Sequence, residues 1–166
     1  MLKPESPENA FGVYVHLPWC VKKCPYCDFN SHAIKQDLPE TEYLQALIRD
    51  IEMESSLVQD RSITSIFFGG GTPSLFGENS IGTIIETLER TIGIERDAEI
   101  TLEANPGTAE AGRFKGYRQV GVNRLSIGVQ SFDDATLKRI GRIHGGSEAL
   151  AAIDYCLLYT SPSPRD

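Results

Sequence analysis

The sequence predicts an α/β fold built around a parallel sheet, either an open doubly wound sheet or part of a (β/α) barrel. Short apolar runs alternate with longer stretches in which apolar residues recur at helical spacing, and turn residues separate the two kinds of segment. Four such strand-then-helix units follow one another along the chain. Strands joined in this way are parallel, because each return crossing needs a helix and right-handed crossovers are the rule. The local pattern fits both architectures.

The first two units occupy the N-terminal half of the chain. FGVYVHL at 11–17 is a β-rich run and predicts the first strand. Pro39 stands at a first helical position and apolar residues follow at intervals of three, four and seven, so 39–58 is predicted to be a helix. The run at 63–68 predicts a second strand, closed by three glycines. The next helix is predicted from the helical spacing of Ile81, Ile84, Ile85, Leu88 and Ile92.

The last two units are shorter. A third strand is expected at 99–104, and the Asn-Pro-Gly that follows it marks its end. A helix is expected at 108–120, although its periodicity is weaker and it contains two glycines. The apolar run at 124–129 predicts the fourth strand. Two further helical stretches follow at 133–140 and 146–155.

Composition excludes several classes of protein. The 166 residues include 16 Lys and Arg against 23 Asp and Glu, a net charge of −7, so we expect no nucleic-acid partner. The content of 40% hydrophobic and 23% charged residues is that of an ordinary soluble domain. No run approaches the roughly 18 apolar residues that cross a bilayer, so no transmembrane segment is expected. The N-terminal tail, 1–10, lacks the apolar stretch of a secretory signal, and a cytoplasmic location is therefore expected.

The C-terminal tail, CLLYTSPSPRD at 156–166, reads as the translation of an adapter used in transposase-based sequencing libraries. A natural tail rich in Ser and Pro is the alternative. We treat this tail as an artefact, which leaves 11–155 as the core domain and three native cysteines. The core is then expected to be the N-terminal part of a longer protein.

Three cysteines follow the first strand in the pattern CxxxCxxC, as Cys20, Cys24 and Cys27. A structural disulfide is not expected in a cytoplasmic protein, so metal or cluster binding is the natural interpretation. Two lysines between the first two cysteines favour the thiolate forms. Three cysteines suit a 4Fe-4S cluster that keeps one iron open, whereas zinc would need His16 or His32 as a fourth ligand.

Other polar or small residues also follow the ends of predicted strands. Gly69, Gly70, Gly71 and Thr72 follow the second strand, Glu103 and Asn105 end the third, and Gln130 follows the fourth. Each has an ordinary alternative, such as a tight turn for the glycines or a solvated carboxylate for Glu103. The carboxyl ends of parallel strands share one rim, however, and such rims bind ligands in α/β folds. We therefore expect these residues to converge on one site.

The motif CxxxCxxC, with Tyr26 before the third cysteine, resembles the signature of the radical S-adenosylmethionine (SAM) superfamily. The strings YVHLPWCVKKCPYCDFNS, FFGGGTPS, LEANP and GVNRLSIGVQSF resemble the oxygen-independent coproporphyrinogen III oxidase family over 11–155. The resemblance implies that the longer protein, of which this core is expected to be the N-terminal part, forms a six-strand (β/α) barrel. About four of its βα units are present here. It also implies that Cys20, Cys24 and Cys27 hold a 4Fe-4S cluster. An electron from the cluster would split SAM to a 5′-deoxyadenosyl radical, and a flavodoxin or ferredoxin is an expected electron donor.

The resemblance further implies which residues contact SAM. The glycines would meet its amino end, Glu103 its ribose, and Gln130 its nucleoside. Tyr14 in the first strand could equally be a core residue, and Arg142 could be a surface cation. The implied SAM-binding set is Tyr14, Tyr26, Gly69, Gly70, Gly71, Thr72, Glu103, Gln130 and Arg142.

One departure from the family bears on activity. Oxidases of the family extend the motif to CxxxCxxCxC, but Phe29 occupies the position of the fourth cysteine here. The sequence therefore favours the branch of the family that binds and delivers haem, with the porphyrinogen oxidase as the alternative. A zinc-stabilised structural domain is the remote third possibility. No catalytic residue is assigned, and residues that hold haem in the parent would lie beyond 155.

Overall fold

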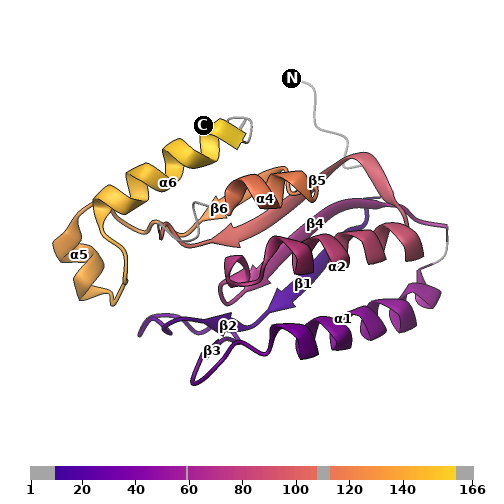
Figure 1. Cartoon of the computed structure of the whole chain (residues 1–166), viewed down its shortest axis with the longest axis horizontal. Helices are drawn as coiled ribbons and strands as arrows, with labels where there is room; N and C mark the ends of the chain where they lie inside the picture. The colour runs from indigo at the N-terminus through magenta and orange to yellow at the C-terminus, as the bar shows by residue number, and fades with distance from the viewer. Residues whose placement is uncertain (1–9, 59, 108–112, 160–166) are drawn as a thin grey trace.

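A four-stranded parallel sheet forms the centre of the computed structural model, which describes residues 10–58, 60–107 and 113–159 (Figure 1). The strands are ordered β1-β4-β5-β6, and each pairs in parallel with its neighbour. The predicted α/β fold with a parallel sheet is confirmed. The strands of this sheet are β1 (Gly12–Leu17), β4 (Ile63–Gly70), β5 (Ile94–Ala104) and β6 (Arg124–Ile127).

Helices follow the strands in the predicted alternation. Figure 1 shows α1, α2 and α4 on one face of the sheet, and α6 packs against α4. The helices are α1 (Glu40–Glu54), α2 (Glu78–Thr91), α4 (Phe114–Gln119), α5 (Asp134–Arg139) and α6 (Gly146–Tyr159). Two 3-10 turns, η1 (Ser55–Leu57) and η2 (Pro73–Leu75), and a second small sheet of β2 (Trp19–Cys20) and β3 (His32–Ala33) complete the fold.

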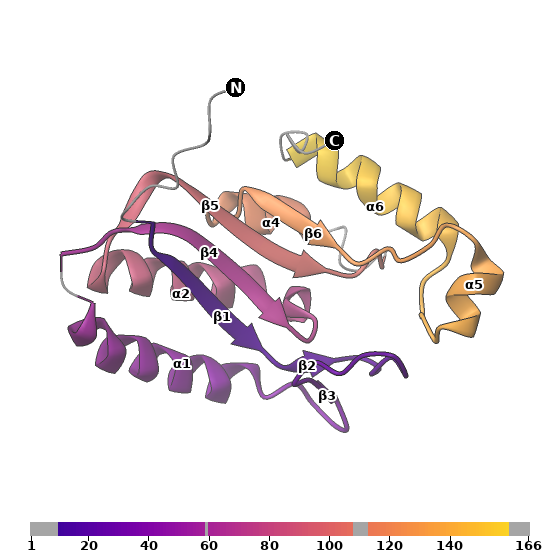
Figure 2. The same cartoon turned by 180° about the vertical axis from the view of Figure 1, so that it is seen from behind.

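The two faces of the sheet differ in character because side chains alternate along each strand. One row across the strands consists of Val15, Phe68, Leu102 and Leu125, and packs into the hydrophobic core under the helices. The adjacent row consists of Tyr14, Phe67, Thr101 and Arg124 and lies on the opposite face. No described helix lies over that second face (Figure 2), and Tyr14 there is 57% exposed. Tyr14 is therefore not a core residue.

The structure corrects several predicted boundaries. The helix predicted at 39–58 ends at Glu54, because the hydroxyls of Ser55 and Ser56 donate to carbonyls one turn back and the chain tightens into η1. The third strand begins at Ile94 rather than at residue 99, since exposed polar residues at 95–97 hide its apolar pattern. A shift of register between β4 and β5 occurs over the same stretch.

Other differences concern short or C-terminal segments. β2 and β3 were not predicted, because strands of two residues carry no periodic pattern. Of the helix predicted at 108–120, Phe114–Gln119 is observed as α4, and 108–112 lies outside the described residues. The last helix, α6, continues beyond residue 155 to Tyr159.

The N-terminus of α2 is capped by a residue from another helix. Its own N-cap, Gly77, has no side chain, and Glu40 Oε1 of α1 instead accepts bonds from Gly77 N (2.7 Å) and Ser80 Oγ (2.6 Å). We expect Glu40→Ala to lower the free energy of unfolding by about 1–2 kcal/mol. Glu42→Ala, also in the first turn of α1 but exposed, should cost no more than about 0.5 kcal/mol. Urea denaturation followed by circular dichroism measures both, and equal losses would contradict the capping role.

Candidate functional site

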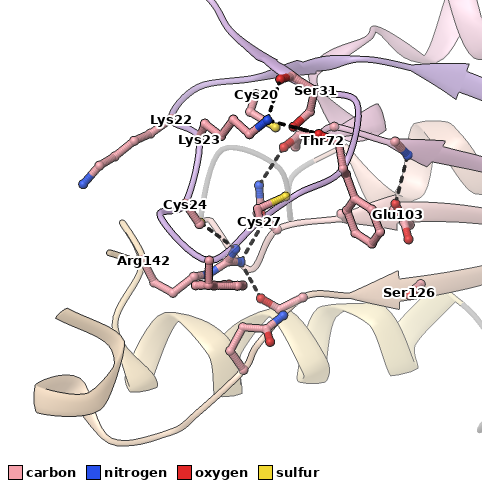
Figure 3. Close-up of a pocket in the computed structure, with 18 of the residues that line it drawn as sticks. Cys20, Lys22, Lys23, Cys24, Cys27, Ser31, Thr72, Glu103, Ser126 and Arg142 are labelled. Atoms are coloured by element: carbon pink, nitrogen blue, oxygen red, sulfur yellow. Dashed lines mark hydrogen bonds between the residues drawn. The ribbon is translucent and has the colours of Figure 1, made fainter. Parts of the chain in front are cut away.

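A cleft of about 320 Å³ lies at the carboxyl ends of the parallel strands, as the strand-end residues predicted (Figure 3). The residues that line it come from the cysteine loop and from the ends of β4, β5 and β6. Of the predicted site residues, the cleft brings together Cys20, Cys24, Tyr26, Cys27, Gly70, Gly71, Thr72, Glu103, Gln130 and Arg142. Tyr14 and Gly69 do not line it.

The cysteine loop, 20–31, begins at the last residue of β2, leads to β3 and carries the three thiols of the cleft. Cys20, Cys24 and Cys27 form no disulfide, and each is partly exposed. The loop makes a turn in which Cys27 N donates to Cys24 O over 3.1 Å. The arm of the loop that leads to β3 is held to the main sheet, because His16 Nε2 of β1 lies 2.9 Å from the carbonyl oxygen of Asn30. The thiols are therefore free to bind a metal or a cluster at the rim of the sheet.

The thiols line one cleft but do not converge on a single point. Within the described ranges, no three Cys, His, Asp or Glu side chains are placed to hold one metal ion. A zinc ion would need such convergence, because its thiolate bonds are only about 2.3 Å long. His16, the proposed fourth ligand, contacts Asn30 instead, and His32 is exposed on β3. A 4Fe-4S cluster with one open iron needs no fourth protein ligand, so the three thiols of the cleft fit such a cluster without His16 or His32.

Arg142 connects the cysteine loop to the strand ends. Its Nη2 donates to Asn105 Oδ1 (2.7 Å) and to the Gly128 carbonyl, and its Nη1 lies 3.6 Å from Cys24 Sγ. Asn105 Nδ2 in turn donates to Thr72 Oγ1 over 3.1 Å. The Arg142 Nε atom is buried with no hydrogen-bond partner among the described residues. Arg142 therefore ties the cysteine loop to the segments that follow β5 and β6.

Two glycines at the end of β4 allow the backbone to approach its neighbours closely. Gly70 has φ +113°, a conformation that other residues rarely adopt, and a Cβ there would lie 2.6 Å from the His16 ring. A Cβ on Gly71 would lie 2.5 Å from the carbonyl oxygen of Trp19. Both glycines are thus required for packing between the end of β4 and the segment that leads into the cysteine loop.

Glu103 and Tyr14 lie on the uncovered side of the sheet. Burial raises the pKa of the Glu103 carboxyl above its usual value, and a hydrogen bond from Gly70 N (3.3 Å) partly opposes this. Burial also raises the pKa of Tyr14, and the negative charge of Glu103 adds to that increase. The Tyr14 hydroxyl lies 3.4 Å from His16 Nδ1, and its ring packs close to Gly69. Tyr14 and Gly69 therefore form one group beside the cleft.

Tyr26 and Gln130 complete the rim. Burial raises the pKa of Tyr26, and a hydrogen bond with Cys24 adds to that increase. Gln130 has φ +70°, and the adjacent Val129 carbonyl contacts His144 Nε2 at 3.0 Å. Ser126 was not predicted as a site residue, although it also lines the cleft and pairs with Glu103 across β5 and β6. Only the strand register, which the sequence does not contain, reveals that position.

One protein-family model matches a segment that contains both the sheet and the cleft. A family model described as the radical SAM superfamily matches residues 14–162. The chain belongs to the radical SAM superfamily. Radical SAM proteins in general use an iron–sulfur cluster together with SAM. The cysteine loop and the strand ends of the cleft all fall within the matched radical SAM segment.

Known radical SAM proteins similar to this chain include haem chaperones. The chain is 51% identical over 155 residues to "Heme chaperone HemW" of Haemophilus influenzae, covering 91% of this chain and 40% of that protein. It is 40% identical over 154 residues to "Radical S-adenosyl methionine domain-containing protein 1, mitochondrial" of the mouse, covering 91% of this chain and 35% of that protein. The chain thus spans well under half the length of these relatives.

A solved radical SAM structure has the same fold. The chain superposes on coproporphyrinogen III oxidase (HemN) of Escherichia coli with a TM-score of 0.84 and 29% identity, covering 93% of this chain and 36% of that chain. The prediction of a partial radical SAM barrel is confirmed. None of the described helices is long and apolar enough to span a membrane.

Proposed function

We propose that this radical SAM chain holds a 4Fe-4S cluster through the thiolates of Cys20, Cys24 and Cys27. The observation that carries the proposal is that all three thiols line one cleft at the carboxyl ends of the parallel strands. Three thiolates leave one iron without a protein ligand, so a small molecule can bind there. When bound, the cluster would supply the electron that cleaves SAM reductively. Arg142, 3.6 Å from Cys24 Sγ, offsets negative charge at this site.

SAM would lie in the cleft beside the thiols. Gly70, Gly71 and Thr72 bring backbone polar groups to its edge, where the amino end of SAM would bind. Glu103 supplies carboxylate oxygens for the ribose hydroxyls, and Gln130 an amide for the nucleoside. The guanidinium of Arg142, which lines the cleft, supplies positive charge for the carboxylate of SAM. Tyr26 flanks the cluster end of the cleft, whereas Tyr14 and Gly69 support the site from the adjacent sheet face.

We further propose that the whole protein binds haem and delivers it. Phe29 replaces the fourth cysteine that the porphyrinogen oxidases carry, which argues against their oxidative decarboxylation. The relatives called haem chaperones, at 51% and 52% identity, support the same assignment. Haem ligands would be contributed by parts of the protein outside this chain.

An oxygen-independent coproporphyrinogen III oxidase, which acts in porphyrin biosynthesis, is the alternative. The TM-score of 0.84 to an enzyme of that name favours it over unrelated radical SAM reactions. In either case the partners would be SAM, a haem or porphyrinogen, and an electron donor of the flavodoxin or ferredoxin type. We propose a cytoplasmic location, although one animal relative is named as mitochondrial.

The test uses the full-length protein reconstituted anaerobically with iron and sulfide. A brown chromophore with broad absorption near about 400 nm is expected of a cluster, and a colourless, zinc-loaded protein would contradict the proposal. The same preparation is then given haem and an apo-haem protein, or coproporphyrinogen and SAM. Transfer of haem without formation of protoporphyrinogen supports the chaperone. Turnover of coproporphyrinogen would establish the oxidase instead.

A further inference from the structure

The cysteine loop depends on side chains for its shape. Within it, the backbone bond from Cys27 N to Cys24 O closes one turn, and Ser31 N donates to Phe29 O over 2.7 Å at the loop's end. The first turn carries both Cys24 and Cys27, and the second lies on the arm that leads to β3. Among the described residues, the pairing of β2 with β3 ties the base of the loop, and no backbone hydrogen bond joins the Cys24–Cys27 turn to the second arm.

The side chain of Lys23 connects this turn to the second arm. Its Nζ donates to the carbonyl oxygens of Phe29 (3.1 Å) and Ser31 (3.2 Å), so its side chain crosses the loop from the first arm to the second. We call these two hydrogen bonds the Lys23 brace. Ser31 is only 3% exposed, so the brace ends on a buried part of the fold. Figure 3 shows Lys23 extended toward Ser31, whereas the side chain of Lys22 extends away from Ser31.

The brace joins the start of the Cys24–Cys27 turn to the arm that leads to β3. Cys24 directly follows Lys23, and Cys27 lies two residues before Phe29. Hydrogen bonds from an ammonium group to carbonyl oxygens are charge-assisted, and therefore stronger than neutral ones. A lysine that bonds two carbonyls at once restricts how far the arms can separate.

We propose that Lys23 is a positioning residue that holds the Cys24–Cys27 turn against the arm that leads to β3, and so places these two thiols for the cluster. This inference rests on the proposed function, because it assumes that the cysteines hold a cluster. Lys23 does not bind iron itself. It acts through the backbone of Phe29 and Ser31, in the way that groups around a metal site orient its ligands.

Lys23→Met and Lys22→Met form a matched pair for the test. Both variants remove one positive charge from adjacent positions of the loop, but only Lys23→Met removes the brace. After anaerobic reconstitution of the full-length protein, we follow the loss of cluster absorbance under an iron chelator and record the electron paramagnetic resonance spectrum of the reduced cluster. Lys23→Met is expected to lose its cluster about tenfold faster than wild type, with a broadened spectrum. Lys22→Met should stay within about twofold.

Two additional measurements separate positioning from folding. Lys23→Arg keeps a charged donor and should retain its cluster longer than Lys23→Met. Since Lys23 is exposed, the metal-free Lys23→Met protein should unfold within about 0.5 kcal/mol of wild type. Equal cluster loss in the two methionine variants, or a metal-free Lys23→Met protein that is itself unfolded, would overturn the inference. A wild-type protein that binds no cluster would instead overturn the proposed function.

Discussion

Replacing Cys20, Cys24 or Cys27 by Ala is expected to abolish the stable iron–sulfur cluster. Each substitution in the loop removes one of only three protein ligands, and a cluster held by two thiolates is open to solvent and to loss of iron.

Iron and acid-labile sulfide per chain, measured after anaerobic reconstitution, check this expectation. The three loop variants should each retain less than about a tenth of the wild-type cluster. The metal-free proteins should keep wild-type circular dichroism, because the three thiols are partly exposed and none belongs to the core. Wild-type iron content in any of the three loop variants would refute the ligand assignment.

Much of the fold could be predicted because local pattern and tertiary role agree. Val15 and Leu17 alternate with Tyr14 and His16 in β1, and this alternation survives in the structure as a core face and an uncovered face. The N-terminal part of β5 could not be predicted, since exposed polar residues at 95–97 occupy a strand position that only pairing with β4 defines. Pairing between distant segments cannot be predicted from the hydrophobic pattern of a short stretch of sequence.

The cleft could be predicted for a different reason. Residues at the ends of parallel strands must share a rim, so Cys20, Thr72, Glu103 and Gln130 could be grouped before their coordinates were known. The separation of Tyr14 from this group could not, because it depends on which way a side chain leaves β1. The brace formed by Lys23 could not be predicted either. A long flexible side chain can reach many hydrogen-bond acceptors, and the sequence does not indicate which of them it meets.

The second large effect is expected at Gly71, where two backbones meet. Gly71 N donates to Leu17 O over 2.9 Å, and the next residue, Thr72, donates from its N to Trp19 O over 2.7 Å. A Cβ on Gly71 would lie 2.5 Å from that same Trp19 oxygen and 2.7 Å from the carbonyl carbon of Pro18. These are main-chain atoms, so no side chain can turn aside to make room.

Gly71→Ala must therefore push the end of β4 away from the segment that precedes Cys20. We expect a loss of about 1–3 kcal/mol in the free energy of unfolding, the usual cost of an added methyl in a packed site. Because Gly71 and Cys20 line the same cleft, SAM binding to the reconstituted protein should also weaken, by about tenfold or more. Urea denaturation and isothermal titration measure the two effects separately.

Gly107→Ala is the control, since a Cβ there would meet no described atom within 4 Å. It should leave both stability and SAM affinity close to wild type, or raise stability slightly by restricting the unfolded chain. Weakened SAM binding with unchanged stability in Gly71→Ala would place the methyl in the ligand's space rather than against Trp19. Two unchanged values would mean that the end of β4 does not approach Trp19 as closely as the structure shows, and the packing role of Gly71 would then be wrong.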